Sequence, residues 1–162
     1  MKAYECVQSA GPTTRYRKIN LIVVHCTASP SNVDLSPEEL DRMHRNRGFQ
    51  GCGYHFYITK DGLVHAMRPV EQIGAHAKGF NRNSIGVAYE GGLDPDGHPQ
   101  DTRTAKQRGM LRSLIGRLKV EFHVDRVVGH RDLSPDRNGD GMISPDEWLK
   151  ECPCFEVQEE NY

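Results

Sequence analysis

The chain has 162 residues, enough for one domain with a single buried core and too few for two ordinary domains. Its 21 lysine and arginine residues nearly balance its 22 aspartate and glutamate residues, so bulk charge does not indicate binding to nucleic acid or to a membrane surface. No apolar stretch is long enough to cross a bilayer, and residues 1–18 lack the apolar segment of a secretory signal peptide. We therefore expect cytoplasmic synthesis, no membrane insertion, no nucleic-acid partner and a monomeric protein.

The sequence predicts a short arm followed by one domain. Residues 1–17 are polar, mixed in charge and interrupted by Gly11 and Pro12, which indicates an N-terminal arm or leader. Residues 18–162 are expected to form the domain. The chain contains five cysteines. In a reducing compartment we expect one of them to be a metal ligand and the others to be free thiols.

The first predicted element of the domain is a strand that ends in a histidine. Leu21 to Val24 are four consecutive apolar residues, typical of a strand buried on both faces, and His25 follows them. In open α/β sheets, ligands usually bind at the carboxyl ends of the strands. A second predicted strand, at residues 126–129, ends in the same way at His130.

Two capping boxes predict two helices. Ser36 with Glu39 marks the start of a helix that should end near Arg47. Thr104 with Gln107 marks the start of a second helix, which carries an apolar stripe at helical spacing. The stripe consists of Met110, Leu111, Leu114, Ile115 and Leu118. We interpret it as part of the core and not as a cofactor site.

Aromatic and β-branched residues between the helices predict a hairpin. Residues 51–59 and 63–66 are separated by a Lys-Asp-Gly turn signal, which favours two antiparallel strands. Strand alternation predicts that Tyr54 faces the same side as Phe56 and that His55 faces the other side. This pattern alone favours Tyr54 as a core aromatic residue.

A loop rich in glycine and asparagine precedes a strand predicted at residues 85–89. His76 and Lys78 lie in this loop, where either side chain could face a polar substrate. The same composition also suits a compact turn with no other role. Strands and helices thus alternate along the chain, which predicts an α/β fold: a single domain with a central mixed β-sheet flanked by helices.

Cys152 completes a candidate metal site with the two strand-end histidines, His25 and His130. Two imidazoles and one thiolate suit Zn²⁺, and three protein ligands leave the fourth tetrahedral position for water, as in catalytic zinc sites. The three residues lie far apart in the sequence and form no compact metal motif. Taken singly, each histidine is more often a capped or surface residue than a metal ligand.

Residues 136–147 match the twelve-residue calcium loop of the EF-hand. Oxygen-bearing side chains occupy positions 1, 3 and 5, glycine occupies position 6 and glutamate position 12. The predicted Ca²⁺ ligands are Asp136, Asn138, Asp140, the carbonyl of Met142, and Glu147. The alternative is an acidic insertion that folds without metal, because Pro135 prevents a helix from leading into the loop. If the loop closes, it should bring residues 147–152 beside His130.

Five sequence blocks, in order, resemble one known family. They are VVHCTAS at 23–29, GYHFYITKDG at 53–62, GAHAKGFNRNSIGVAYEGG at 74–92, GHRD at 129–132 and KECPCFE at 150–156. They resemble the zinc-dependent N-acetylmuramoyl-L-alanine amidases of the second type, which include phage amidase lysozymes and peptidoglycan recognition proteins. The resemblance covers roughly residues 19–157 and implies the fold of that family. The insertion at 136–147 departs from the compact phage enzymes.

The resemblance implies a reaction and its site residues. The reaction is hydrolysis of the amide between N-acetylmuramic acid and L-alanine in bacterial peptidoglycan. The resemblance implies zinc bound by His25, His130 and Cys152, as the residues alone suggested. It also implies two catalytic residues, Tyr54 and Lys150.

Roles for the remaining site residues follow from this chemistry. Tyr54 would orient or deprotonate the water or donate to the intermediate, and Lys150 would stabilise the oxyanion. His76 is a candidate for substrate binding in the groove. Asp132 is a candidate for orienting a metal ligand.

Three other functions remain open from the sequence. A peptidoglycan-binding module without turnover should lack the cysteine ligand or the tyrosine, and this chain has both Cys152 and Tyr54. A thiol hydrolase would use Cys26 or Cys152 with a histidine and would survive chelation. A calcium-binding regulatory protein is disfavoured by the unpaired loop. Because no export signal is recognisable, we expect a phage or prophage endolysin that reaches the wall after release.

Overall fold

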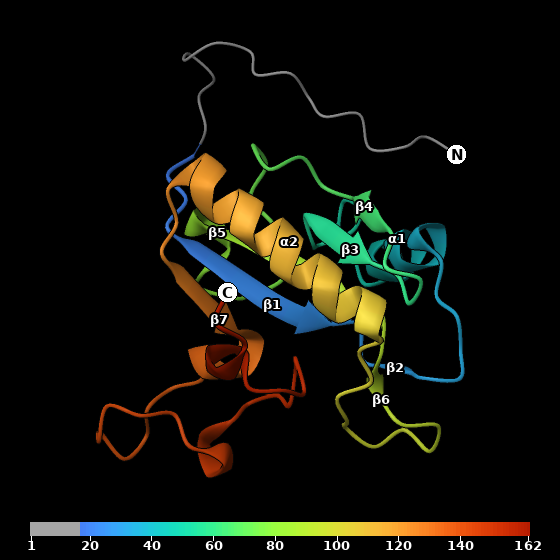
Figure 1. Cartoon of the computed structure of the whole chain (residues 1–162). Coiled ribbons are helices and arrows are strands. Elements are labelled where there is room, and N and C mark those ends of the chain that lie inside the picture. The colour runs from blue at the N-terminus through green and yellow to red at the C-terminus, as the bar shows by residue number, and fades with distance from the viewer. Residues whose placement is uncertain (1–16) are drawn as a thin grey trace.

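The structure, a computed structural model, describes residues 17–162 and is built on one five-stranded sheet (Figure 1). The strands are β1 (Leu21–Cys26), β3 (Phe56–Ile58), β4 (Val64–Ala66), β5 (Ser84–Tyr89) and β7 (Arg126–Gly129). They lie in the order β4-β3-β5-β1-β7, and all neighbours are parallel except β3 and β4. β2 (Ser29–Pro30) and β6 (Gly92–Leu93) form a separate parallel pair. The predicted mixed sheet is confirmed.

Both predicted α-helices are present with their capping boxes. In α1 (Pro37–Asn46) the Ser36 side chain accepts from the backbone N–H of Glu39, and the Glu39 side chain accepts from the N–H of Ser36. The helix ends at Asn46 with Arg47 as its C-cap, and Gly48 follows with a φ of +91°, a conformation that favours glycine. α2 (Ala105–Phe122) begins in the same way at Thr104. Short 3₁₀ helices are η1 (Asn81–Asn83), η2 (His130–Leu133), η3 (Pro145–Glu147) and η4 (Val157–Glu160).

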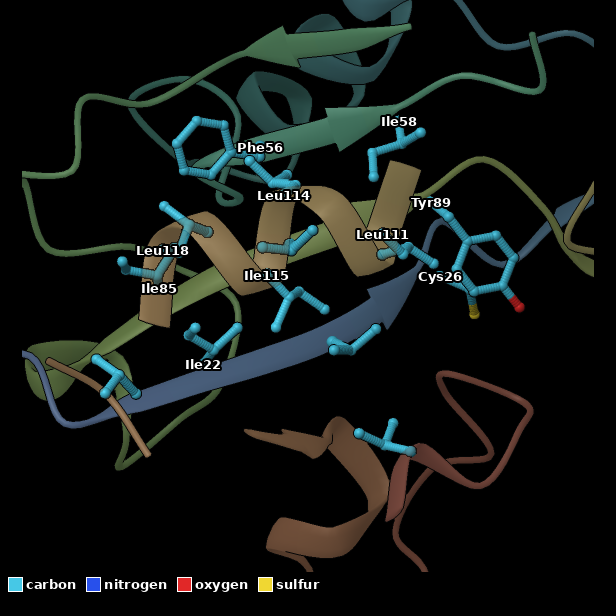
Figure 2. Packing of buried hydrophobic residues seen from close by; sticks show 14 of the residues in the cluster. Ile22, Cys26, Phe56, Ile58, Ile85, Tyr89, Leu111, Leu114, Ile115 and Leu118 are labelled. Atoms are coloured by element: carbon cyan, nitrogen blue, oxygen red, sulfur yellow. The ribbon is translucent and has the colours of Figure 1, made fainter. Parts of the chain in front are cut away.

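One face of the sheet packs against α2 and forms the main core (Figure 2). Ile22, Val24 and Cys26 of β1 point to this face because alternate residues of a strand share a side. Four residues of the predicted helical stripe are buried against them: Leu111, Leu114, Ile115 and Leu118. The interpretation of the stripe as core is confirmed.

The opposite face carries smaller apolar clusters and a row of polar side chains. Leu21 and Val23 pack there with Ala77 and Val128. Leu40 of α1 packs on the same side of the sheet, against Tyr57 and Ala88. By strand alternation His25 also points to this face. The candidate site therefore lies on the face of the sheet opposite α2.

The first strand of the predicted hairpin is shorter than expected. β3 begins at Phe56, so Tyr54 and His55 lie in an irregular segment, and the predicted alternation fails for Tyr54. Tyr54 packs with the cluster that contains Tyr57, not with the one that contains Phe56. The cause is a close approach: a Cβ at Gly53 would lie 2.2 Å from the carbonyl oxygen of Ala75, whose N–H donates to the Gly53 carbonyl.

Residues 1–16 of the predicted arm lie outside the described residues, of which Arg17 is the first. The Arg17 guanidinium donates to the carbonyl oxygens of Val70, Asn81, Arg82 and Ser84. Over residues 17–162, neither α-helix has the length and apolarity needed to span a bilayer.

Candidate active site

His25 and His130 meet because their strands are neighbours. β1 and β7 are parallel, with Val24 opposite Gly129, so one further step along the register places His25 opposite His130. Their ring centroids are 4.6 Å apart. His25 is 1% exposed and His130 is partly exposed. The two strands thus bring both histidines to one edge of the sheet, as the sequence predicted.

Cys152 reaches this edge from the C-terminal segment. Its Sγ lies 3.8 Å from His25 Nδ1 and accepts a hydrogen bond from the backbone N–H of Cys26 at 3.2 Å. The Arg131 N–H donates to the Cys152 carbonyl, which ties the segment to η2. Gly129 permits the approach, since a Cβ there would lie 2.7 Å from Pro153 Cδ.

These three residues fit a tetrahedral zinc ion. One donor atom from each of His25, His130 and Cys152 lies within 4.8 Å of the other two. Zinc–nitrogen and zinc–sulfur bonds at a tetrahedral angle separate the two donor atoms by about 3.6 Å, close to the 3.8 Å between Cys152 Sγ and His25 Nδ1. A third protein donor leaves one position for solvent, which is the composition of a catalytic site.

Tyr54 lies beside the ligands. Its ring centroid is 5.0 Å from that of His25 and 5.2 Å from that of His44. Burial, and after it the neighbouring thiols of Cys152 and Cys26, raise the pKa of Tyr54 well above its ordinary value. The phenol therefore stays protonated near neutral pH and can act as a hydrogen-bond donor.

Lys150 and His130 line a cavity of about 550 Å³ next to the candidate metal site. Lys78 and Arg47 also border it, so three cationic side chains surround the opening. Burial, and second the positive charge of Lys150, lower the pKa of His130 to about 4. Lys150 and the candidate ligand His130 thus line the same cavity.

His76, predicted to bind substrate, lies on the side of the His25 ring that faces away from Cys152. It is 8% exposed, and its Nδ1 is 2.9 Å from Nε2 of His25. Its Nε2 is 3.2 Å from the hydroxyl of Ser84. His76 is among the residues that line the cavity, but both of its ring nitrogens face protein groups. A direct substrate contact stays a prediction.

Asp132 and Cys26 act on the site through the backbone. The Asp132 carboxylate accepts from the N–H of Gly129, just before His130, and was predicted to orient a ligand. Cys26 contributes its N–H to the Cys152 sulfur, a role that sequence reasoning missed because backbone donors carry no sequence signal. The contact between His76 and His25 was also missed.

The acidic loop at residues 136–147 folds through hydrogen bonds to its own backbone. The Glu147 carboxylate accepts from the N–H groups of Arg137, Asn138 and Ser144, and Asp136 accepts from those of Gly139 and Gly141. Within residues 17–162, the carboxylates of Asp136, Asp140 and Glu147 are not gathered as closely as the His25 group. Calcium binding through Asp136, Asn138, Asp140, Met142 and Glu147 stays a prediction.

The loop nevertheless closes as expected. Glu147 draws its two ends together, and the Leu149 N–H donates to the Ser134 hydroxyl at 3.0 Å. The Arg131 guanidinium lies 3.8 Å over the Trp148 ring. Residues 147–152 are thus fastened beside His130 by hydrogen bonds and by this cation–π contact.

A buried histidine near the site makes the fold sensitive to acid. Burial lowers the pKa of His55 to about 4, and the cations of Arg17 and Arg68 contribute to the shift. The unfolded chain has the ordinary value of about 6.5, so it takes up this proton first as the pH falls. The contribution is fully present above pH 6.5 and is lost between about 6.5 and 4, at a cost of about 3 kcal/mol.

Urea unfolding of the metal-free protein at a series of pH values would test this. His55→Asn keeps an acceptor for the Gly86 N–H, which donates to His55 Nδ1 in the structure. That variant should lose stability less steeply between pH 6.5 and 4 than the parent chain. Equal slopes for His55→Asn and the parent would contradict the assignment.

Comparison with known proteins agrees with this geometry. The family model for N-acetylmuramoyl-L-alanine amidase matches residues 15–146. The chain is 34% identical over 145 residues to an endolysin of Klebsiella phage KP32, which covers 90% of this chain and 87% of that protein. The solved N-acetylmuramoyl-L-alanine amidase LysC from Clostridium intestinale URNW has a TM-score of 0.69 at 29% identity, with 90% of this chain and 84% of that chain covered.

A peptidoglycan recognition protein shares the fold at lower identity. Bumblebee PGRP-SA has a TM-score of 0.66 at 21% identity, with 88% of this chain and 79% of that chain covered. The family match ends before Lys150 and Cys152, so these two residues rest on the geometry of the C-terminal segment. With most of its length matched by the family model, the chain belongs to the N-acetylmuramoyl-L-alanine amidase family.

Proposed function

We propose that the chain is a zinc-dependent amidase of bacterial peptidoglycan. It would cleave the amide between the lactyl group of N-acetylmuramic acid and L-alanine. The observation that carries the proposal is the convergence of donor atoms from His25, His130 and Cys152 beside an open cavity. Family membership supplies the reaction class, and the endolysin of phage KP32 supplies the biological setting.

The metal would be held by two imidazole nitrogens and one thiolate. Bound there, zinc supplies Lewis acidity, which activates water and polarises the scissile carbonyl. The Cys26 N–H donates to the thiolate sulfur and helps to hold its negative charge. The parallel register of β1 and β7 brings the two imidazoles to the same edge of the sheet.

Tyr54 and Lys150 would act on the reacting carbonyl. The Tyr54 hydroxyl stays protonated, so its role is to donate a hydrogen bond as negative charge develops on the oxygen. This favours donation over deprotonation of water, the alternatives that the sequence left open. The Lys150 ammonium at the cavity wall would stabilise the same charge.

The cavity gives the substrate a place next to these groups. Its cationic border, formed by Arg47, Lys78 and Lys150, suits the carboxylates of a peptide stem. His76 borders the same cavity and was predicted to bind substrate there. The Ca²⁺ prediction stays outside this proposal, because the loop carboxylates already accept backbone N–H donors.

Two alternatives are separated by chemistry. A binding module would retain zinc or wall affinity without releasing amines. A thiol hydrolase would work without metal. Neighbouring Cys152 and burial raise the pKa of the Cys26 thiol to about 12, so Cys26 is poorly suited to act as a thiolate nucleophile.

Metal analysis together with a cleavage assay tests the proposal. Purified protein should contain stoichiometric zinc, and it should release new L-alanine amino groups from purified peptidoglycan. A chelator should remove zinc and stop release, and added zinc should restore both. Cleavage that continues in the chelated, zinc-free protein would overturn the zinc mechanism. Zinc binding without amine release would favour the binding module.

The biological role that we propose is that of an endolysin. The relative from Klebsiella phage KP32 carries that name and aligns over most of both chains. On this proposal the enzyme is made in the cytoplasm and meets its peptidoglycan substrate after release. A monomer suffices, because every proposed site residue comes from one chain.

A further inference from the structure

We propose that His76 is a positioning residue: it fixes the ring orientation and tautomer of the metal ligand His25 from within a slot made by Gly74 and Gly86. The inference rests on the proposed zinc site. The two nitrogens of His25 point in opposite directions. Nδ1 faces the Cys152 sulfur at 3.8 Å, and Nε2 faces Nδ1 of His76 at 2.9 Å.

One arrangement of protons satisfies all of these contacts. A metal-binding Nδ1 of His25 must carry a lone pair, so the proton sits on Nε2 and is donated to Nδ1 of His76. His76 then carries its own proton on Nε2, which is 3.2 Å from the Ser84 hydroxyl oxygen. Each hydrogen bond in the row therefore runs in the same direction, away from the metal: His25 donates to His76, and His76 donates to Ser84.

Both rings are neutral in this arrangement. Each imidazole then has one donor and one acceptor nitrogen: Nε2 of His25 donates to Nδ1 of His76 at 2.9 Å, and Nε2 of His76 donates to the Ser84 hydroxyl at 3.2 Å. A neutral His76 can accept the His25 proton, whereas a charged one would oppose it.

The backbone around His76 is shaped to hold the ring. A Cβ at Gly86 would lie 2.6 Å from Cγ of His76, and a Cβ at Gly74 would lie 2.5 Å from its Cδ2. Any larger residue at either position would displace the imidazole. The Asn81 side-chain oxygen accepts from the N–H groups of His76 and Ala77, both at 2.8 Å. The ring is thus confined by two glycines and its backbone is anchored by an asparagine.

The strand register explains why this slot lies behind the metal. β1 and β5 are parallel, with Leu21 opposite Ser84 and Val23 opposite Gly86. Ser84 and Gly86 therefore point to the same face as His25, which lies two residues beyond Val23. The imidazole of His76 lies over Gly86 and bridges the hydroxyl of one strand to the ligand of the next.

This contact also argues against substrate binding as the main role of His76. Both of its ring nitrogens already have protein partners, so neither is free to bind a substrate group. His76 lines the cavity but is only 8% exposed. Partners that orient a ligand imidazole in this way typically change metal affinity or activity by about 10- to 100-fold.

Two substitutions test whether His76 orients His25 through a hydrogen bond or only fills space beside it. His76→Asn places its side-chain oxygen near the position of Nδ1 and can accept the His25 proton, whereas His76→Leu cannot. Zinc affinity, measured by competition with a chromophoric chelator, should fall about 10- to 100-fold in the leucine variant. The asparagine variant should recover most of that loss. Equal zinc affinity in the leucine variant and the parent would overturn the inference.

The tautomer of His25 gives a readout that needs neither metal nor activity. Long-range ¹H–¹⁵N spectra of the metal-free parent should show the His25 proton on Nε2 alone. The leucine variant should show a mixture of tautomers. A parent His25 protonated on Nδ1 would overturn the inference even if the protein binds zinc. Failure of the parent to bind zinc would instead refute the proposed function, and the spectra would still decide the tautomer.

Ser84→Ala provides a second route if the leucine variant does not fold. It keeps the His76 ring and removes the acceptor for its Nε2–H. Zinc affinity should fall by less than in the leucine variant, and the His25 tautomer should become mixed. At saturating zinc, KM for wall fragments should not change, since KM reports substrate contact. A raised KM with unchanged zinc affinity would assign His76 to substrate binding and overturn positioning.

Discussion

Cys152→Ala is expected to abolish both zinc retention and amide hydrolysis. The sulfur supplies the negative charge of the ligand set, and its loss leaves two neutral imidazoles at a buried position. The rate should fall by about 10³-fold or more, because the metal itself is lost. Removal of a single oxyanion donor typically costs less, about 10²- to 10³-fold. Elemental analysis after dialysis and an amine-release assay measure the two effects.

Cys154→Ala is the matched control. Cys154 lies two residues further along the same segment. Its sulfur contacts Cys26 Sγ at 3.9 Å and does not belong to the group of donor atoms from His25, His130 and Cys152. This variant should keep stoichiometric zinc and the parent rate. Circular dichroism should show that both variants fold. Stoichiometric zinc in a folded Cys152→Ala protein would contradict the assigned ligand set.

Pairing of parallel strands made much of the metal site predictable. Two apolar runs, each followed by a histidine, indicated buried strands that end at the same edge of a sheet. The sheet order then decides whether the histidines meet, and β1 and β7 are neighbours with His25 and His130 in register. The order itself was not readable from the apolar runs. Resemblance to a family supplied what periodicity could not.

Tyr54 and His76 show where pattern reasoning failed. The alternation rule placed Tyr54 on the core face, but the strand begins two residues later because Gly53 packs against the Ala75 carbonyl. A contact between backbone segments far apart in sequence leaves no periodic signal. His76 was noticed as a polar residue in a glycine-rich loop. Gly74 belongs to the predicted loop and Gly86 to the predicted strand, and neither assignment indicated that both glycines make room for the imidazole.

The acidic insertion shows that one sequence pattern can fit two different structural roles. Acidic and amide side chains at alternate positions suit calcium, and they equally suit acceptance of backbone N–H groups in tight turns. In the structure Asp136 and Glu147 do the latter, and the loop closes through them. The fastening of residues 147–152 beside His130 followed correctly from the position of the insertion.

Tyr54→Phe is expected to keep zinc and lose rate. The phenol ring packs against His25, and phenylalanine retains that packing while removing the only donor on the ring. The kcat for amine release should fall by about 10²- to 10³-fold, the range for loss of one donor to a developing oxyanion. Zinc affinity and KM should change little, because the hydroxyl acts after substrate and metal are bound.

Tyr57→Phe separates this effect from loss of a buried hydroxyl in general. Tyr57 belongs to the same apolar cluster, is fully buried, and donates its hydroxyl to the Leu35 carbonyl at 2.8 Å. Its substitution should lower the free energy of unfolding by about 1 kcal/mol and leave kcat unchanged. Tyr54→Phe should instead lower kcat and leave the free energy of unfolding nearly unchanged. If Tyr54→Phe retains the parent kcat with zinc bound, the hydroxyl has no part in the reaction, and Lys150 together with the proposed zinc must stabilise the charge that develops on the carbonyl oxygen.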